Sequence, residues 1–276
     1  SERVAVAMRA AGVRLVEEAT VEGVTVGDDG WVRQVTAADG STYDCDLLVL
    51  ALGVLPRTSF AAQAGLPTGD RGDLCVDDRG LLAPGVWAAG DCCEVLHRLT
   101  GDRVFLPLGT HAAKQGRVVG TNLGGGEATF DGVLGTAITR FVHDDVHLEI
   151  ARTGLGELEA AAAGLDAEAL VTEGTTASGY MPEAEPIVVK VVAERGTRRL
   201  LGTQIVGGPG AAKRIDTPAT ALWAGMTVDD VAAMDLSYSP PFATTWEIVQ
   251  LAVRRLAERL GTPGTISPDL VRRVSH

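Results

Sequence analysis

One part of this sequence has residue types and a spacing that could bind a ligand. A short apolar run from residue 85 ends in Gly90 and Asp91, and the segment Pro107-Leu108-Gly109-Thr110 then opens an expected helix over residues 112–123. A glycine lets a ligand approach the main chain closely, and a helix N-terminus favours negative charge. A lone carboxylate beside them can accept hydrogen bonds from hydroxyl groups. The pattern predicts a site for a polyhydroxylated, anionic ligand such as a dinucleotide.

Other side chains that could do chemistry are less organised. The four cysteines form neither a C-x-x-C pair nor a zinc-ligand spacing: Cys45, Cys75, Cys92 and Cys93. The adjacent pair would make a strained disulfide, so we expect reduced thiols and a cytoplasmic protein, with a dithiol redox site as the alternative. No metal site is expected, because the histidines lack a ligand pattern. We expect four histidines at the surface: His97, His111, His143 and His147. For His111 the alternative is a position near the predicted dinucleotide ligand.

Length and charge narrow the function classes. The 276 residues are enough for two domains. The net charge of −12 argues against nucleic acid as a partner. No apolar run reaches the length of a membrane span, and the N-terminus has no signal-peptide pattern.

The first third of the chain predicts part of a nucleotide-binding domain. Residues 2–11 read as a helix with no strand before it, so we expect the chain to start inside a domain. Residues 21–26 and 31–37 predict antiparallel strands. Residues 46–51 are almost continuously apolar, which is typical of a buried parallel strand.

From about residue 129 the pattern changes to strands followed by helices. We expect strands over residues 134–142, 146–153, 169–172, 186–193 and 200–206, and helices over residues 157–163, 215–223, 228–234 and 246–260. Thr227 with Asp230, and Thr244 with Glu247, predict capping boxes at the last two helices. This order indicates an α+β domain whose helices lie on one face of an antiparallel sheet.

With these elements placed, nearly the whole chain resembles the C-terminal part of the flavin-dependent pyridine nucleotide–disulfide oxidoreductases. Residues 46–57 resemble the strand that leaves the NAD(P)H domain, and residues 85–91 resemble the second FAD motif, whose Asp binds the ribityl chain. Residues 107–117 resemble the segment that reaches the flavin ring, and residues 129–260 the dimerisation domain. The resemblance implies FAD-binding roles for Gly90, Asp91, Pro107, Leu108, Gly109 and Thr110.

Four segments narrow the branch: residues 180–186, 201–207, 213–216 and 235–242. They are similar to the coenzyme A-disulfide reductase, NADH oxidase and NADH peroxidase group. In coenzyme A-disulfide reductases, tyrosines at the positions of Tyr180 and Tyr238 reach across the dimer to the partner's active site.

The resemblance implies a catalytic role for both tyrosines, because two phenols can protonate a thiolate leaving group. The His–Glu pair of glutathione-reductase-like relatives is absent, since no histidine lies between His147 and His276. The alternative is that Tyr180 and Tyr238 are plain interface or core residues. Lys213 and Arg214 likewise read as a surface basic pair, or as ligands for a phosphate of coenzyme A.

The sequence departs from the family in one respect. It contains neither of the family's two Gly-x-Gly-x-x-Gly motifs nor the redox cysteine between them. We therefore expect a fragment: residues 1–57 from the NAD(P)H domain, 58–128 from the C-terminal half of the FAD domain, 129–261 as the dimerisation domain, and 262–276 as a tail.

The expected fold class is α/β plus α+β, with a partial Rossmann-like FAD/NAD(P)-binding segment followed by an α+β dimerisation domain with an antiparallel sheet. The resemblance implies a homodimeric oxidoreductase that uses FAD and NAD(P)H. Its substrate would be a small-molecule disulfide such as CoA-disulfide, a persulfide, or oxygen. The alternative is a non-catalytic dimerisation or binding module. We expect neither nucleic acid nor membrane as a partner.

Overall fold

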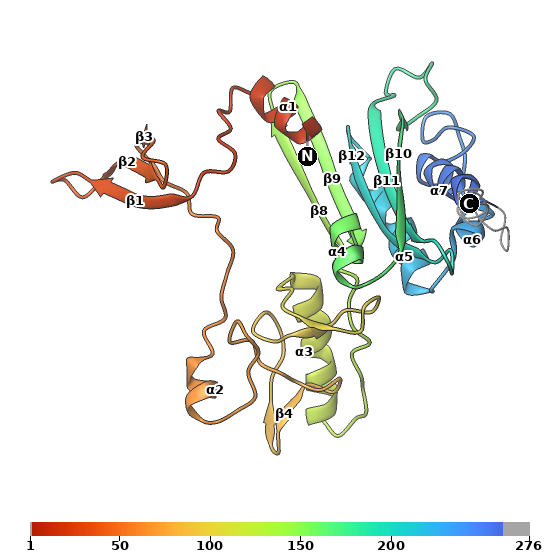
Figure 1. Ribbon diagram of the computed structural model, residues 1–276. Helices are drawn as coiled ribbons and strands as arrows, with labels where there is room; N and C mark the ends of the chain where they lie inside the picture. Colours follow the sequence, from red (N-terminus) through yellow and green to blue (C-terminus); the bar gives the residue numbers. More distant parts are fainter. Residues whose placement is uncertain (1, 262–276) are drawn as a thin grey trace, which may run out of the picture. The chain divides into compact units, whose positions relative to one another are not determined.

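The computed structural model describes residues 2–261 and divides the chain into two compact units, residues 1–55 and residues 56–276 (Figure 1). The expected tail over residues 262–276 lies outside the described residues.

The first unit contains one helix and a small antiparallel sheet. Helix α1 covers Glu2–Ala10, and strands β1 (Val21–Val26), β2 (Val32–Ala37) and β3 (Thr42–Asp44) pair in the order β1-β2-β3. Alternation along β2 buries Val35 and Ala37, as expected for a strand with one covered face. The predicted antiparallel strands over residues 21–37 are present.

The apolar run over residues 46–51 does not form the predicted buried strand. The structure has no strand there, and Leu47, Val49 and Leu50 are 75%, 77% and 73% exposed. A parallel strand needs neighbours for its main-chain hydrogen bonds and a cover for each face. None of the strands in residues 2–261 pairs with this run, so the local pattern alone does not form the element.

The second unit begins with short elements that lead to one long helix. In chain order they are α2 (Ser59–Gln63), β4 (Leu81–Ala83), β5 (Val86–Trp87), β6 (Val95–Leu96), β7 (Arg103–Val104) and α3 (Gly109–Leu123). Strands β4 and β5 pair as one antiparallel hairpin, and β6 and β7 as another. A small core joins Ala61, Leu74, Val76, Leu82 and Cys93.

The fully buried side chains of α3 are polar. Leu123 is 63% exposed, whereas Gln115 and Asn122 are buried. Asn122 donates to the carbonyls of Arg79 and Ala128 and accepts from the N–H of Ala128. These side chains pair with main-chain groups of the surrounding loops, which would otherwise be buried without partners.

The later part of the second unit contains a five-stranded antiparallel sheet (Figure 1). Its strands are β8 (Ala137–His143), β9 (Val146–Gly154), β10 (Ala167–Thr175), β11 (Pro186–Glu194) and β12 (Leu200–Gly207). They pair in the order β10-β11-β12-β9-β8. The predicted antiparallel sheet of the dimerisation domain is confirmed.

Helices cover the sheet unequally. Helices α5 (Asp216–Trp223), α6 (Val228–Ala232) and α7 (Ile248–Arg259) pack with one face, where Val191 belongs to the main core. Adjacent residues of a strand point to opposite faces. Val192 accordingly joins a second cluster with Ala160 of the short helix α4 (Glu157–Ala162).

The two predicted capping boxes have different outcomes. Thr227 and Asp230 form the expected box: Asp230 N–H donates to Thr227 Oγ1, and Thr227 N–H donates to the Asp230 carboxylate. The prediction of a capping box formed by Thr244 and Glu247 is wrong. Glu247 is itself the N-cap of α7 and accepts from Val249 N–H over 2.6 Å, while Thr244 donates to the carbonyl of Trp246. The long Glu side chain reaches the first turn directly.

Candidate functional site

The Gly90–Asp91 turn lies against the first turns of helix α3. Gly90 has φ +95°, a conformation that only glycine adopts readily. Its N–H donates to Oε1 of Gln115 over 2.9 Å. A Cβ on Gly90 would lie 3.7 Å from Cβ of Ala112, so the turn and the helix are in close contact. Asp91 follows with an exposed side chain that is available to a ligand.

The N-terminus of α3 has no side-chain cap. Its N-cap residue is Leu108, an extended residue without a side-chain acceptor, and Gly109 and Thr110 are exposed. Helix N-terminal amides carry partial positive charge and need external acceptors. This end of α3 can therefore receive an anionic or oxygen-rich group.

His111 lies beneath this helix end and is buried, so its expected surface position is wrong. Its Nδ1 lies 3.0 Å from the carbonyl oxygen of Leu106. Burial lowers the pKa of His111, and the charge of Lys114 acts in the same direction, while the Leu106 carbonyl and the charge of Asp91 partly oppose that shift. A neutral ring with its proton on Nδ1 donates to Leu106 and holds the segment before α3.

The segment that contains Pro107, Leu108 and Thr110 lines two open clefts. Pro107 and Leu108 line a mostly apolar cleft of about 500 Å3, and Thr110 with His111 lines a second cleft of about 530 Å3. Small-molecule sites usually have volumes of ~300–1,000 Å3. The space beside the predicted cofactor-binding segment is thus large enough for part of a cofactor.

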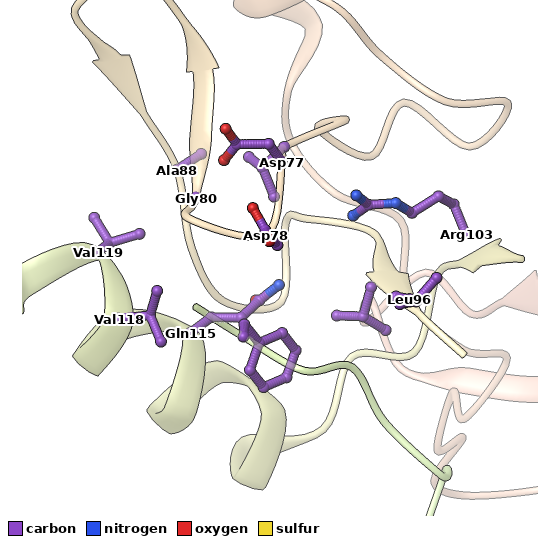
Figure 2. A pocket seen from close by; sticks show the side chains of 12 residues that line it. Asp77, Asp78, Gly80, Ala88, Leu96, Arg103, Gln115, Val118 and Val119 are labelled. Carbon is purple, nitrogen blue, oxygen red and sulfur yellow. The ribbon is translucent and has the colours of Figure 1, made fainter. Parts of the chain in front are cut away.

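A smaller pocket lies on another side of α3 (Figure 2). It holds only about 30 Å3, room for water and not for a nucleotide. Val119 of α3 and Gly80 meet there, and a Cβ on Gly80 would lie 2.2 Å from Cγ2 of Val119. Gly80 also has φ +85°, so only glycine fits. This pocket belongs to the packing that positions α3.

The two tyrosines predicted for catalysis lie on exposed loops that touch each other. Tyr180 lies between β10 and β11 and is 76% exposed, and Tyr238 lies between α6 and α7 and is 49% exposed. Ser178 N–H donates to the carbonyl of Pro240 over 2.9 Å, and Ser178 Oγ donates to the carbonyl of Ala243 over 3.2 Å. The fold thus brings the two tyrosine-bearing loops together.

Sequence reasoning missed the role of Arg214. Its side chain is 16% exposed, against 75% for Lys213, so the expected surface pair is wrong for Arg214. The Arg214 guanidinium binds the carboxylate of Glu247 and the carbonyls of Thr176 and Phe242. The sequence signal for a partly buried Arg214 was its position directly before an apolar residue, Ile215, which the structure buries.

All four cysteines are free thiols. The Sγ atoms of Cys92 and Cys93 are 3.8 Å apart, and burial together with the neighbouring Cys92 raises the pKa of Cys93 strongly. A thiol in that state is a weak nucleophile at neutral pH. Within residues 2–261, no group of three or more His, Cys, Asp or Glu side chains is arranged to hold a metal ion.

None of the helices in the described part of the chain is both long and apolar enough to cross a bilayer.

Family models match two parts of the chain. The model described as pyridine nucleotide-disulphide oxidoreductase matches residues 1–116, and the model of the dimerisation domain of the same family matches residues 145–248. The NAD(P)H sulfur oxidoreductase (CoA-dependent) of Pyrococcus furiosus is 39% identical over 79% of this chain and 48% of its own length. The NAD(P)H coenzyme A polysulfide/persulfide reductase of Pyrococcus horikoshii is 37% identical over 86% and 52%.

Solved structures agree with these matches. An NAD-dependent persulfide reductase from A. fulgidus superposes with a TM-score of 0.87 at 36% identity, covering 93% of this chain and 46% of its own. A Bacillus anthracis protein named CoADR-RHD superposes with a TM-score of 0.85 at 31% identity, covering 94% and 45%. The chain spans about half the length of the curated relatives it matches. The predicted family and fold class are confirmed, and the chain corresponds to the C-terminal part of such a protein. It belongs to the FAD-dependent pyridine nucleotide–disulfide oxidoreductases, in the branch of the coenzyme A-disulfide reductases and NADH oxidases.

Proposed function

We propose that the protein containing this chain is an FAD-dependent NAD(P)H oxidoreductase that reduces a small disulfide, a persulfide or oxygen. The observation that carries this proposal is the uncapped N-terminus of α3 beside the Gly90–Asp91 turn, joined through Gln115. Relatives named for CoA-dependent sulfur reduction, coenzyme A disulfide reduction and NADH oxidation support the same chemistry. Among these acceptors we favour a persulfide or CoA-disulfide, since one relative at 37% identity is named a coenzyme A polysulfide/persulfide reductase and one at 26% identity a coenzyme A disulfide reductase.

The residues present fit one side of an FAD site. Asp91 offers an exposed carboxylate to the ribityl hydroxyls, and Gly90 keeps the main chain free of a side chain. Pro107, Leu108, Gly109 and Thr110 lead into a helix end that stabilises negative charge. Bound FAD would supply the passage of electrons from NAD(P)H to the acceptor.

Tyr180 and Tyr238 are the proposed proton donors. A phenol can donate a proton to the sulfur that leaves as a thiolate when a disulfide is split. Both phenols lie on exposed loops of the domain that matches the family's dimerisation model. We infer a homodimer in which these loops reach the partner's active site. We further infer a cytoplasmic protein with the domain boundaries expected from the sequence, near residues 57, 128 and 261.

A non-catalytic dimerisation module is the second candidate. The specific observation in its favour is that residues of the five-stranded sheet and of helices α5, α6 and α7 belong to one continuous core. Such a core can support dimerisation without a bound cofactor.

The test uses the protein expressed from its complete reading frame. A visible flavin spectrum that NADH or NADPH bleaches, with reoxidation by CoA-disulfide or CoA persulfide, is the expected result. Reoxidation by oxygen alone would favour an oxidase. A colourless dimer that shows no NAD(P)H consumption would contradict the enzymatic proposal and favour the dimerisation module.

A further inference from the structure

We propose that Arg214 is a positioning residue that holds Tyr180 and Tyr238 as one rigid pair; this inference rests on the proposed role of the two tyrosines. Arg214 belongs to the short 3-10 helix η1 (Ala212–Ile215), which follows β12. The N–H of Ala212 donates to the carboxylate of Glu149 in β9 over 2.8 Å. Arg214 therefore extends from a base that is attached to the sheet.

The guanidinium of Arg214 connects the two tyrosine-bearing loops. Its Nη2 donates to the carbonyl of Thr176 and, over 2.8 Å, to the carbonyl of Phe242. Thr176 lies four residues before Tyr180, and Phe242 lies four residues after Tyr238. One planar group thus binds the main chain of both loops, in each case four residues along the chain from the tyrosine. A guanidinium suits this task because its donors form a rigid fork.

Glu247 fixes the third side of the same group. Its Oε1 accepts from Nη1 of Arg214, and its Oε2 accepts from the N–H of Val249 as the N-cap of α7. The Arg214 and Glu247 side chains are 16% and 14% exposed. Buried charges that lose a partner are strongly destabilised. The arrangement therefore resists opening of either loop.

The ion pair of Arg214 and Glu247 differs from an ordinary surface ion pair, because the pair itself is mostly shielded while the two tyrosines are exposed. The Arg214 and Glu247 side chains are mostly buried, whereas Tyr180 and Tyr238 are exposed. Phenols that transfer a proton to a substrate need a fixed geometry, because small displacements reduce the rate strongly. A mostly buried clamp on the main chain of both loops provides that geometry and leaves the phenols free for the substrate.

Arg198 offers a matched control. Its guanidinium also binds one carboxylate, that of Asp229, and two main-chain carbonyls, those of Ala257 and Gly261. The N–H of Arg198 donates to the carbonyl of Glu194, which is the last residue of β11. The N–H of Thr176 donates to the carbonyl of Glu185, which directly precedes the first residue of β11. A nine-residue strand separates these ends, which corresponds to about 30 Å. Arg198 therefore clamps the opposite end of the sheet.

The experiment is 19F NMR of this chain labelled with 3-fluorotyrosine, which gives three resonances because the sequence has three tyrosines. In Arg214→Met, the Tyr180 and Tyr238 resonances should shift or broaden together while Tyr43 stays unchanged. Amide exchange in residues 176–185 and 238–247 should rise about tenfold or more, from the loss of hydrogen bonds to a charged group. Arg198→Met should lower the melting temperature but leave both resonances in place.

Two results would overturn the proposal: an Arg214→Met spectrum with unmoved Tyr180 and Tyr238 signals, or equal movement of those signals in Arg198→Met. If Arg214→Met does not fold, Arg214→Lys decides, since it keeps the charge for Glu247 but cannot reach all three acceptors. A smaller shift of both signals supports the clamp, and an unchanged spectrum contradicts it. Because this readout needs no turnover, it is independent of whether Tyr→Phe variants of the complete enzyme lose activity.

Discussion

The Gln115 side chain accepts a hydrogen bond from the main-chain N–H of Gly90 over 2.9 Å and thereby joins helix α3 to the Gly90–Asp91 turn. Gln115 is 5% exposed, and its Nε2 also donates to the carbonyl of Glu94. One amide thus binds the main chain on both sides of Asp91. The two parts of the proposed flavin site are held in place by a single buried side chain.

Replacing Gln115 by Leu should destabilise this part of the protein. The substitution keeps a similar volume but leaves the half-buried N–H of Gly90 without its partner, which costs about 1 kcal/mol. Urea denaturation followed by circular dichroism measures the change in the free energy of unfolding. The exposed Arg117 on the same helix supplies the control, because Arg117→Ala should change stability by less than about 0.5 kcal/mol. Equal stability of Gln115→Leu and the wild type would show that the contact contributes nothing.

Asp91→Ala should weaken FAD retention in the complete protein, since it removes the carboxylate proposed to bind the ribityl chain. The measurement is the ratio of flavin to protein absorbance after gel filtration. Asp145, at the exposed turn between β8 and β9, gives a control of the same chemistry. Asp145→Ala should retain the flavin of the wild type. A full flavin content in Asp91→Ala would remove Asp91 from the site.

Periodicity in the sequence predicted most of the second unit, because its strands and helices bury alternating or helically spaced apolar residues. Val189 and Val191 of β11 point into one core, as the pattern requires. The same reasoning was wrong for residues 46–51. An apolar run records that a strand can be buried but carries no information about which strands pair with it.

The candidate site was predicted only in part, for a different reason. Gly90, Asp91 and the segment before α3 lie in one local pattern, which sequence can show. Gln115 and Arg214 act through main-chain groups far away in the chain: Gly90 N–H in one case, and the carbonyls of Thr176 and Phe242 in the other. A main-chain acceptor has no residue type, so no sequence motif indicates such a contact.

Tyr238→Phe should lower kcat for disulfide reduction by the complete enzyme by about 100-fold, the low end for loss of a general acid. The substitution removes only the phenol oxygen and leaves the loop contacts of Pro240 and Ala243 intact. Steady-state kinetics with CoA-disulfide measures kcat and KM separately, with flavin content as a check on folding. Tyr43→Phe, in strand β3 of the first unit, is the control and should match the wild type. Unchanged turnover in Tyr238→Phe would make Tyr238 structural.

Acidification below neutral pH should destabilise the chain through His97 and His111. Burial lowers the pKa of both rings from 6.5, so the folded state binds fewer protons than the unfolded state as pH falls through that value. The contribution of each ring to the free energy of unfolding is therefore fully present above the pKa that the ring has in the unfolded state. It declines as the pH falls from there to the pKa of the folded state, by at most ~1.4 kcal/mol per pH unit for each ring. Asp229 and Glu159 have lowered pKa values, through Arg198 and Arg152 respectively, so their contributions persist over this interval.

Urea unfolding at about pH 7.5 and about pH 5.5 measures the loss, and the double variant His97→Gln, His111→Gln should show a smaller one. An equal loss in the variant would assign the pH dependence to other groups.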